Sequence, residues 1–210
     1  MALYEQKPRL GPIGLRAILM KVHGDLFQIH RYVDQWSAYY PAEFTNLEKL
    51  VLALEDRRFL DHAGLDAISA LREIGRAIRF KRHGGASTID MQFVRTATGY
   101  RERRLSRKLY EGFLAFVIQY RYSKIIILRS YLNHAFFGSH LLGAKKASYE
   151  IFDTHPDFLT VEQAAFLAAM LVYPRPLAGG SDWLAKVRRR ADYGVRIYIS
   201  NKKRFDKLPS

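Results

Sequence analysis

Hydrophobic residues along the chain recur mainly at helical spacing. Thr45 and Glu48 form a capping box, which marks the start of a helix. The apolar positions that follow share one face of that helix: Leu47, Leu50, Val51 and Leu54. Thr160 and Gln163 form a second capping box, before an apolar helix that Pro174 ends. The pattern therefore predicts an all-α or nearly all-α fold.

Segment 105–120 carries apolar residues on two sides of a predicted helix. One side presents Leu109, Phe113, Phe116, Val117 and Tyr120, and the other presents Leu114, Ala115 and Ile118. A helix that is apolar all round is normally buried all round, so we expect both faces to be covered. Ser123 is a candidate cap for a further helix through Asn133, and the Gly-rich segment 83–88 is predicted to be a loop.

The chain divides by composition into three segments. Residues 1–40 form an amphipathic and basic N-terminal segment, 41–180 the main domain, and 181–210 a basic C-terminal helix and tail. Within the first segment, Leu15, Ile18, Leu19 and Val22 recur near helical spacing. This helix could lie on a membrane surface or pack on its own domain. We find neither a run of about 20 apolar residues nor a signal-peptide pattern in the sequence.

Charge and amino-acid composition limit the ligands and the kinds of site that the chain can have. The chain has 34 Lys and Arg against 20 Asp and Glu, a formal net charge of +14, which attracts nucleic acid, anionic lipid head groups or phosphorylated substrates. With 49% hydrophobic residues in 210, a sizeable core can be buried. The absence of cysteine excludes disulfides, thiolate metal sites and cysteine nucleophiles.

Two carboxylates border apolar stripes and are candidates for acid–base chemistry. Glu55 ends the helix described first, where a half-buried carboxylate is a better general base than a solvated one. The alternative is a surface ion pair with Arg57 or Arg58. Glu111 lies among apolar residues of segment 105–120, and Arg107, one turn earlier, could satisfy it by an i,i+4 pair.

A run of small residues lies between these carboxylates. Gly84 to Thr88 would let backbone amides and hydroxyls approach a phosphate closely, although a flexible loop before a helix has the same composition. Several cations follow within two dozen residues, among them Arg95, Arg103, Arg104, Arg107 and Lys108.

Taken in order, these residues match a set of five motifs. The first consists of Glu55, Asp56, Phe59, His62, Gly64 and Asp66, and the second runs from Gly85 to Gln92 and on to Arg95 and Thr96. The third consists of Arg107, Lys108, Glu111, Lys124, Leu128, Tyr131, Leu132 and Asn133. The fourth comprises Gly138, Gly143, Ala147 and Phe152, and the fifth runs from Leu159 to Pro174.

In these motifs the chain resembles the family-51 glycosyltransferases, the peptidoglycan polymerase domain of bifunctional penicillin-binding proteins and of their monofunctional relatives. The likeness covers residues 41–177. Because nothing after it matches a transpeptidase, the monofunctional type is the closer likeness. It implies a mostly α, lysozyme-like helical domain with a small membrane-facing lobe. It also implies polymerisation of lipid II on the outer, periplasmic face of the cytoplasmic membrane.

The same resemblance assigns roles to residues. Glu55 would deprotonate the acceptor 4-hydroxyl, which attacks the donor anomeric carbon while undecaprenyl pyrophosphate leaves. Arg95, Arg107 and Lys108 would stabilise the leaving group. Glu111, the second catalytic carboxylate, would orient these cations or hold a divalent metal, Mg or Mn, although no cofactor is expected to be obligatory. The remaining substrate-binding positions are Asp56, Phe59, His62, Ser87, Thr88 and Gln92.

His62 also has an interpretation of its own. The seven histidines of the chain show no metal-ligand spacing. We therefore interpret His62 as a structural hydrogen-bonding residue.

Several positions depart from the family pattern: Ala86, Asp90, Met91, Arg95, Thr96, Gln119 and His140. The pattern has Thr at position 90 and Glu at position 119. Asp90 is expected to place an unfavourable negative charge close to the pyrophosphate. Both candidate catalytic carboxylates are nevertheless present, which favours an active enzyme.

Other function classes stay open at this point. One alternative is a catalytically weak protein that binds lipid II or pyrophosphate and regulates wall synthesis. A basic nucleic-acid-binding protein is another, although the chain lacks a recognised binding signature, and a lysozyme-like hydrolase is a third. The expected partners are lipid II, the growing glycan strand, an anionic membrane surface and other cell-wall synthesis proteins, with no nucleic acid.

Overall fold

The computed structural model describes residues 14–33, 43–66, 87–102 and 104–205. In this part of the chain the α-helices are α1 (Leu15–Tyr32), α2 (Asn46–Glu55), α4 (Ile89–Thr98), α5 (Leu105–Ile118), α6 (Lys124–His134), α7 (Ala144–Phe152), α8 (Val161–Ala169), α9 (Ser181–Ser200) and α10 (Lys202–Phe205). Two 3₁₀ turns, η2 (Phe59–Asp61) and η3 (Pro156–Phe158), and a hairpin of β1 (Phe136–Gly138) and β2 (Leu141–Leu142) complete it. The predicted mostly α class is confirmed, and the content is consistent with a lysozyme-like helical domain.

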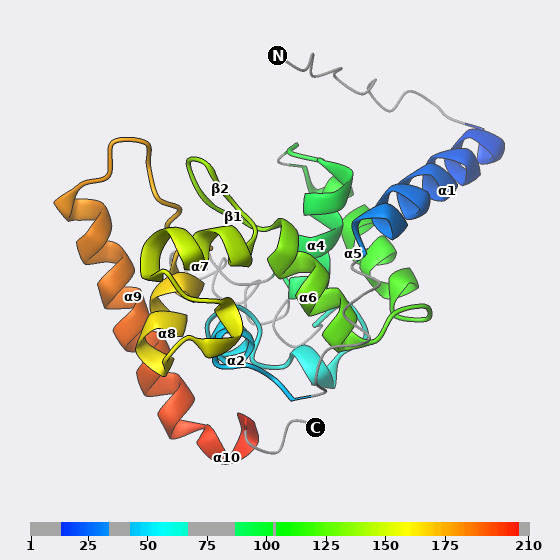
Figure 1. Ribbon diagram of the computed structural model, residues 1–210. Helices are drawn as coiled ribbons and strands as arrows, with labels where there is room; N and C mark the ends of the chain where they lie inside the picture. Colours follow the sequence, from blue (N-terminus) through cyan, green and yellow to red (C-terminus); the bar gives the residue numbers. More distant parts are fainter. Residues whose placement is uncertain (1–13, 34–42, 67–86, 103, 206–210) are drawn as a thin grey trace, which may run out of the picture.

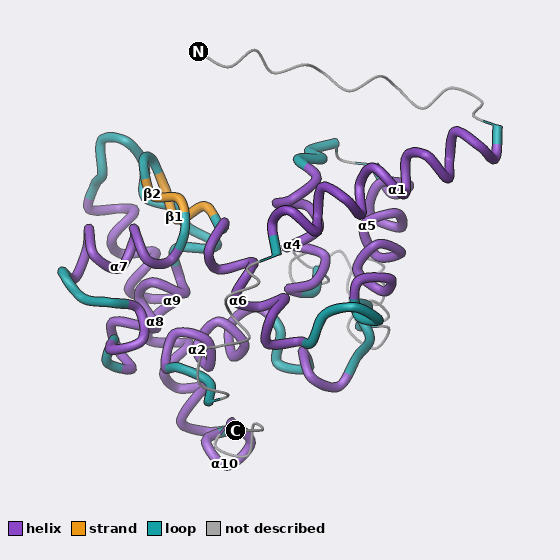
Figure 2. Tube along the Cα trace, turned by 45° about the vertical axis from the view of Figure 1, so that its right-hand side comes forward, coloured by secondary structure: helices purple, strands orange, loops and turns teal. Residues whose placement is uncertain are grey.

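The helices form two groups with α6 between them (Figure 1). Helices α2, α7, α8 and α9 pack on one side, and α1, α4 and α5 lie on the other, as the turned view of Figure 2 also shows. One continuous hydrophobic core joins the groups, with fully buried side chains such as Leu50, Phe93, Ile127 and Leu167. The two groups therefore form one folded unit.

Both predicted capping boxes are present and fix the starts of α2 and α8. In the first, the backbone N–H of Glu48 donates to Thr45 Oγ1 at 3.2 Å, and the N–H of Thr45 donates to Glu48 Oε2 at 2.8 Å. Thr160 and Gln163 repeat this exchange at α8. Ser123 occupies the N-cap position of α6 without a side-chain capping bond. Most of the predicted loop 83–88 lies outside the described residues.

The expectation that α5 is buried on both faces is wrong. Its inner face, with Leu114, Ala115 and Ile118, is buried, but the opposite stripe is exposed. The exposed residues are Leu105, Leu109, Phe113, Phe116 and Tyr120, with exposed fractions from 40% to 80%. They recur every three or four residues, so they form one continuous apolar strip along α5. We call this surface the α5 strip.

Helix α1 divides into an exposed start and a packed end. Leu15, Leu19 and Met20 are each at least 60% exposed, whereas Asp25 and Ile29 are buried. The helix thus packs on the domain through its second half and projects its first half outward (Figure 1). Among the described residues, no helix combines the length and the apolar character needed to cross a bilayer.

The predicted boundary at residue 180 does not separate two cores. Helix α9 packs against α8 and α2, and its residues Val187 and Ala191 belong to the same hydrophobic core. Gly194 permits this contact, because a Cβ atom there would lie 3.0 Å from the side chain of Leu54. The basic C-terminal helix is therefore an integral wall of the domain next to the end of α2.

The β1–β2 hairpin, which the hydrophobic pattern did not predict, contains one of the departures from the family pattern. Its turn holds His140 in the left-handed region, at φ 65°. Glycine adopts this conformation without a steric cost, whereas other residues pay roughly 1–2 kcal/mol. The family preference for glycine at this position follows from the turn.

Candidate functional site

One face of α4 connects the two candidate catalytic carboxylates. Gln92 and Arg95 lie one helical turn apart on this face. The amide of Gln92 reaches Glu55 on α2, and the guanidinium of Arg95 reaches Glu111 on α5. Residues far apart in the sequence therefore meet along a single turn of α4.

Glu55 is the last residue of α2, as predicted, and its side chain is 11% exposed. Its Oε1 accepts a hydrogen bond from Arg190 Nη2 at 2.7 Å, and its Oε2 accepts one from Gln92 Nε2 at 3.4 Å. The sequence offered Arg57 and Arg58 as surface partners, but the ion pair is made by Arg190 from α9. The carboxylate is thus held between two donors and still reaches solvent.

Tyr131 fixes the orientation of Gln92. Its hydroxyl donates to Gln92 Oε1 at 2.6 Å, so the amide nitrogen of Gln92 points toward Glu55. Burial, together with the negative charge of Glu55, raises the pKa of the Tyr131 phenol above its ordinary value, so the hydroxyl remains a donor. The motif match gives Tyr131 no role of its own. In the structure it orients Gln92, which contacts Glu55.

Arg190 is the site residue that sequence reasoning missed. It lies beyond the matched motifs, in a run of three arginines that looks like a solvated face. One signal does single it out: Val187, Arg190, Ala191 and Gly194 share one helical face, and its other three members are buried. A charge within such a stripe should be paired or functional.

Glu111 is fully buried and binds two arginines. Arg95 approaches it with both Nε and Nη2 at 3.2 Å, and Arg107 Nη1 lies 2.7 Å from its Oε1. The predicted Arg107–Glu111 pair is therefore present. Because the carboxylate is bidentate toward Arg95, it fixes the plane of that guanidinium as well as its position.

The other predicted contact residues divide into two groups. Ser87 is half-buried, and its hydroxyl accepts a 3.4 Å hydrogen bond from Arg95 Nη2, which places it beside the cations. Lys108 is half-buried on α5, next to Arg107, and makes no ion pair with the residues described. Thr88 is buried and caps α4, while its hydroxyl donates to the carbonyl of Gly64 at 2.7 Å. Its contacts favour a supporting role.

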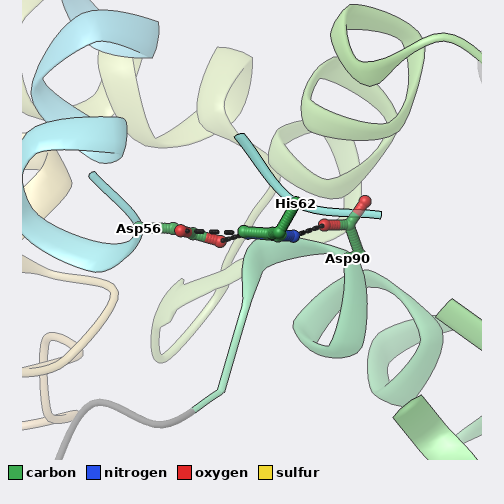
Figure 3. Close-up of side chains that lie close together, drawn as sticks. All are labelled: Asp56, His62 and Asp90. Carbon is green, nitrogen blue, oxygen red and sulfur yellow. Dashed lines mark hydrogen bonds and ion pairs between the residues drawn. The ribbon is translucent and has the colours of Figure 1, made fainter. Parts of the chain in front are cut away.

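Asp56, His62 and Asp90 form a buried line beneath the site (Figure 3). Asp56 Oδ2 accepts from His62 Nε2 at 3.0 Å and from the N–H of Ile89 at 3.1 Å. On the other side of the ring, His62 Nδ1 lies 3.9 Å from Asp90 Oδ2. Phe59, 1% exposed, packs edge-on against the same ring. These contacts agree with a structural role for His62 and tie the end of α2 to the start of α4.

Asp90 is buried and paired with a lysine, so the fold compensates the negative charge that the sequence led us to expect beside the pyrophosphate. It is fully buried, its Oδ2 lies 2.9 Å from Lys124 Nζ, and its Oδ1 accepts a hydrogen bond from Gln119 Nε2. Burial raises the pKa of the Asp90 carboxyl, and Lys124 opposes that shift. Two departures from the family pattern, at positions 90 and 119, therefore contact each other.

A metal fits neither cluster well. Asp56, His62 and Asp90 offer ligand atoms within 4.8 Å of one another, but the two carboxylates flank the ring from opposite sides (Figure 3). The Asp90 carboxylate also already pairs with Lys124. Glu111 belongs to no group of three metal-ligating side chains among the described residues, and both of its oxygens accept from guanidinium groups.

Gly64 brings the first motif against α5. Its φ of 80° lies in the left-handed region, and a Cβ atom there would lie 2.5 Å from the carbonyl oxygen of Ala115. No other residue fits this contact without moving the backbone. The segment after Glu55 is thereby held close to the helix that carries Glu111.

The assembled site pairs a base with a group of cations. Glu55 is a partly accessible carboxylate, and Arg95 and Arg107 present guanidinium groups fixed by a buried acid. The Nε atom of Arg107 is buried without a hydrogen-bond partner in the described part of the chain. Such an arrangement can remove a proton at one end and stabilise an anionic oxygen at the other.

Known proteins similar to this chain are transglycosylases and penicillin-binding proteins. Residues 29–196 match the family described as transglycosylase. The chain is 35% identical over 148 residues to the biosynthetic peptidoglycan transglycosylase of Acinetobacter baylyi, a match that covers 68% of this chain and 63% of that protein.

Two longer relatives show the same likeness. The chain is 33% identical over 155 residues to penicillin-binding protein 1A of Rickettsia bellii, covering 72% of this chain and 20% of that protein. It is 37% identical over 129 residues to penicillin-binding protein 2a of Streptococcus pneumoniae, covering 61% and 17%. The matched part thus spans a fifth or less of these two relatives.

Proposed function

The chain belongs to the transglycosylase family, and we propose that it is a peptidoglycan glycosyltransferase that polymerises lipid II into glycan strands. The observation that carries the proposal is the α4 face on which Gln92 contacts Glu55 while Arg95 contacts Glu111. It supports the proposal because, with Glu55 as the base and Arg95 at the leaving group, the two ends of the reaction would lie on neighbouring parts of one surface. The name of the Acinetobacter relative, a biosynthetic peptidoglycan transglycosylase, supports peptidoglycan as the product.

In the proposed reaction, Glu55 takes the proton of the acceptor 4-hydroxyl as that oxygen bonds to the donor anomeric carbon. The bond between this carbon and the pyrophosphate oxygen breaks, and its electron pair leaves with undecaprenyl pyrophosphate. Attack and departure on opposite faces of the sugar invert the anomeric centre, by analogy with inverting glycosidases. The proton then passes from Glu55 to solvent, which its partial exposure permits.

Arg95, Arg107 and Lys108 would neutralise the charge that develops on the pyrophosphate. Glu111 keeps Arg95 and Arg107 in place, and its burial excludes competing water. Ser87 and Gln92 would contact the donor, whereas Asp56, Phe59, His62 and Thr88 would support the site from below. The protein itself supplies the cations, so we propose that no cofactor is obligatory. A Mg or Mn ion bound by the pyrophosphate oxygens of the substrate is compatible with this scheme.

A membrane surface is the proposed place of action, at the outer face of the cytoplasmic membrane. The α5 strip and the exposed start of α1 together present apolar side chains, and the net charge of +14 attracts anionic lipids. Binding to phosphatidylglycerol vesicles tests this part. Phe113→Glu should weaken co-sedimentation, whereas Phe158→Glu, on the α7–α8 side, should not. Equal effects of both variants would contradict the proposed face. Contacts with other wall-synthesis proteins belong to the same proposal.

Incubation of the purified protein with lipid II in detergent tests the activity. The proposal predicts a ladder of glycan strands, formed with or without added Mg or Mn. Free disaccharide without strands would instead indicate a lysozyme-like hydrolase. Binding of lipid II with no product under any condition would replace the enzyme by a lipid II-binding regulator.

A further inference from the structure

Asp25 is a buried carboxylate on a helix whose first half is exposed. It is 3% exposed, and within the described part of the chain Lys21, Tyr100 and Tyr110 donate hydrogen bonds to it. Lys21 Nζ lies 2.9 Å from its Oδ2, and the hydroxyls of Tyr100 and Tyr110 each lie 2.8 Å from the same atom. A carboxylate buried in this way is stable only with such partners. The cluster therefore attaches α1 to the α4–α5 connection and to α5 itself.

The protonation states in this cluster are well defined. Burial acts to raise the pKa of Asp25, but the hydrogen bonds from Lys21 and the two phenols outweigh it and lower the pKa. Burial and the Asp25 carboxylate raise the pKa values of the Tyr100 and Tyr110 phenols above their ordinary range. At neutral pH an ionised acceptor thus faces protonated donors.

The same cluster extends to the candidate leaving-group site. The carbonyl of Tyr100 accepts a 3.4 Å hydrogen bond from Arg107 Nη1, the nitrogen that also donates to Glu111. Tyr110 directly precedes Glu111 on α5 and lies three residues after Arg107. Tyr100 and Tyr110, two partners of Asp25, therefore lie on either side of Arg107 along the chain.

Ring contacts make the cluster rigid. The ammonium of Lys21 lies 3.7 Å from the ring centre of Tyr110 and 4.5 Å from that of Tyr100. The two rings meet edge to face, with their centres 6.2 Å apart. A displacement of Asp25 would thus disturb both tyrosines together. Asp25 lies before residue 29, where the family match begins.

We propose that Asp25 is a positioning residue: by fixing Tyr100 and Tyr110, it holds Arg107 in the orientation in which it pairs with Glu111 and faces the leaving group. The second half of the proposal rests on the proposed function. The first half concerns geometry alone and can be tested without substrate.

The geometric test follows the side-chain Nε–H resonance of Arg107 by NMR. Asp25→Asn removes the charge that collects the three donors, and Tyr110→Phe removes one donor with a smaller risk to folding. Both variants should shift this resonance. His23→Asn, an exposed change on the same helix, should leave it in place. An unshifted resonance in folded Tyr110→Phe and Asp25→Asn proteins would overturn the proposal.

The functional test measures kcat and KM for lipid II, with binding of inorganic pyrophosphate alongside. Asp25→Asn should lower kcat by about tenfold, since small displacements of positioning groups have effects of this size or larger, and should weaken pyrophosphate binding. Ile29→Val, which loosens the packing of α1 without touching the cluster, should lower thermal stability but leave kcat unchanged. A kcat of Asp25→Asn equal to that of Ile29→Val would refute the positioning role.

The two proposals fail in different ways. A wild-type protein that forms no glycan strands would count against the proposed function, while the Arg107 resonance would still decide the geometric claim. Polymerisation by the wild type with identical kcat in all variants would count against the role of Asp25 alone.

Discussion

Arg190 and Glu55 are 135 residues apart in the sequence, yet their side chains form a 2.7 Å ion pair at the end of α2. The same guanidinium nitrogen also donates to the carbonyl of Leu54 at 3.3 Å. The arginine thus caps the last turn of α2 and orients its terminal carboxylate at once. Helix α9, which by sequence is a basic surface helix, thereby completes the site.

Replacement of Arg190 by alanine should lower the polymerisation rate by about ten- to a hundredfold, because Glu55 would keep only the long contact to Gln92. Arg190→Lys should recover part of the rate, since lysine keeps the positive charge but differs from arginine in the length and geometry of its side chain. Arg189→Ala, on the exposed face of the same helix, is the matched control. Equal rates for the two alanine variants would contradict a role for the ion pair.

This chain has Asp at position 90 and Gln at position 119, where the family pattern has Thr and Glu. Both pairs of residues contain one carboxylate, which in this chain is that of Asp90 and pairs with Lys124. Asp90→Thr should cost about 3 kcal/mol of folding free energy, because it leaves the largely buried ammonium of Lys124 without its carboxylate partner. Gln119→Glu alone should also destabilise, because it opposes two carboxylates. The double variant should regain most of the lost stability in chemical denaturation.

A double-mutant cycle quantifies this coupling, which should exceed about 1 kcal/mol for groups in direct contact. Single-variant losses that simply add in the double variant would show that the two positions do not compensate each other.

Gly194→Ala and Gly24→Ala should change stability in opposite directions. Both glycines lie in helices, where alanine is favoured by about 1 kcal/mol. A Cβ atom at Gly24 meets nothing within 4 Å, so this variant should gain that amount. At Gly194 the Cβ atom would lie 3.0 Å from Leu54, and overpacking typically costs about 1–3 kcal/mol.

We expect a net loss of about 1 kcal/mol at Gly194, and a lower rate because α9 carries Arg190. Thermal denaturation of the two variants side by side measures the difference. A stabilised Gly194→Ala protein would show that the α2–α9 contact is less close than described.

The Asp25 cluster should stabilise the fold over a range of pH that has an acidic limit set by Asp25 and an alkaline limit set by the two tyrosines. The folded-state pKa of Asp25 is lowered, so its contribution is present above the ordinary carboxyl pKa of 3.8 and is lost as the pH falls through the lower folded value. The Tyr100 and Tyr110 phenols have raised pKa values. Their contribution is present below the ordinary 10.0 and is lost as the pH rises through the folded values.

Urea denaturation of the wild type and of Asp25→Asn measures this effect. The difference between their free energies of unfolding should be constant between these limits and shrink outside them. A difference that does not change with pH would exclude an ionised Asp25 as its source.

Local signals in the sequence predicted much of the fold. The capping boxes at Thr45 and Thr160 fixed two helix starts, and the 3.6-residue period placed Glu55 at a helix end and Glu111 beside Arg107. These features depend on neighbours within one or two turns. The family motifs brought together Ser87, Gln92 and Arg95, which the structure also places along one side of α4.

The remaining features depend on contacts between distant segments. The partner of Glu55 comes from α9, and the direction of Asp90 is set by Lys124 and Gln119. The exposure of the α5 strip likewise depends on which face meets α4, since periodicity shows that two faces are apolar and not which one is covered. A sequence pattern therefore identifies residues that could form such contacts, but it does not show which of them meet in the fold.

The rate of lipid II polymerisation by wild type and Glu55→Gln protein tests the account most directly. Glutamine keeps the size of the side chain and cannot accept the proton, so the initial rate should fall by about a hundredfold or more while lipid II still binds. Glu150→Gln, an exposed change on α7, should retain the wild-type rate. A Glu55→Gln protein that polymerises lipid II as fast as the wild type would contradict the assignment of Glu55 as the base.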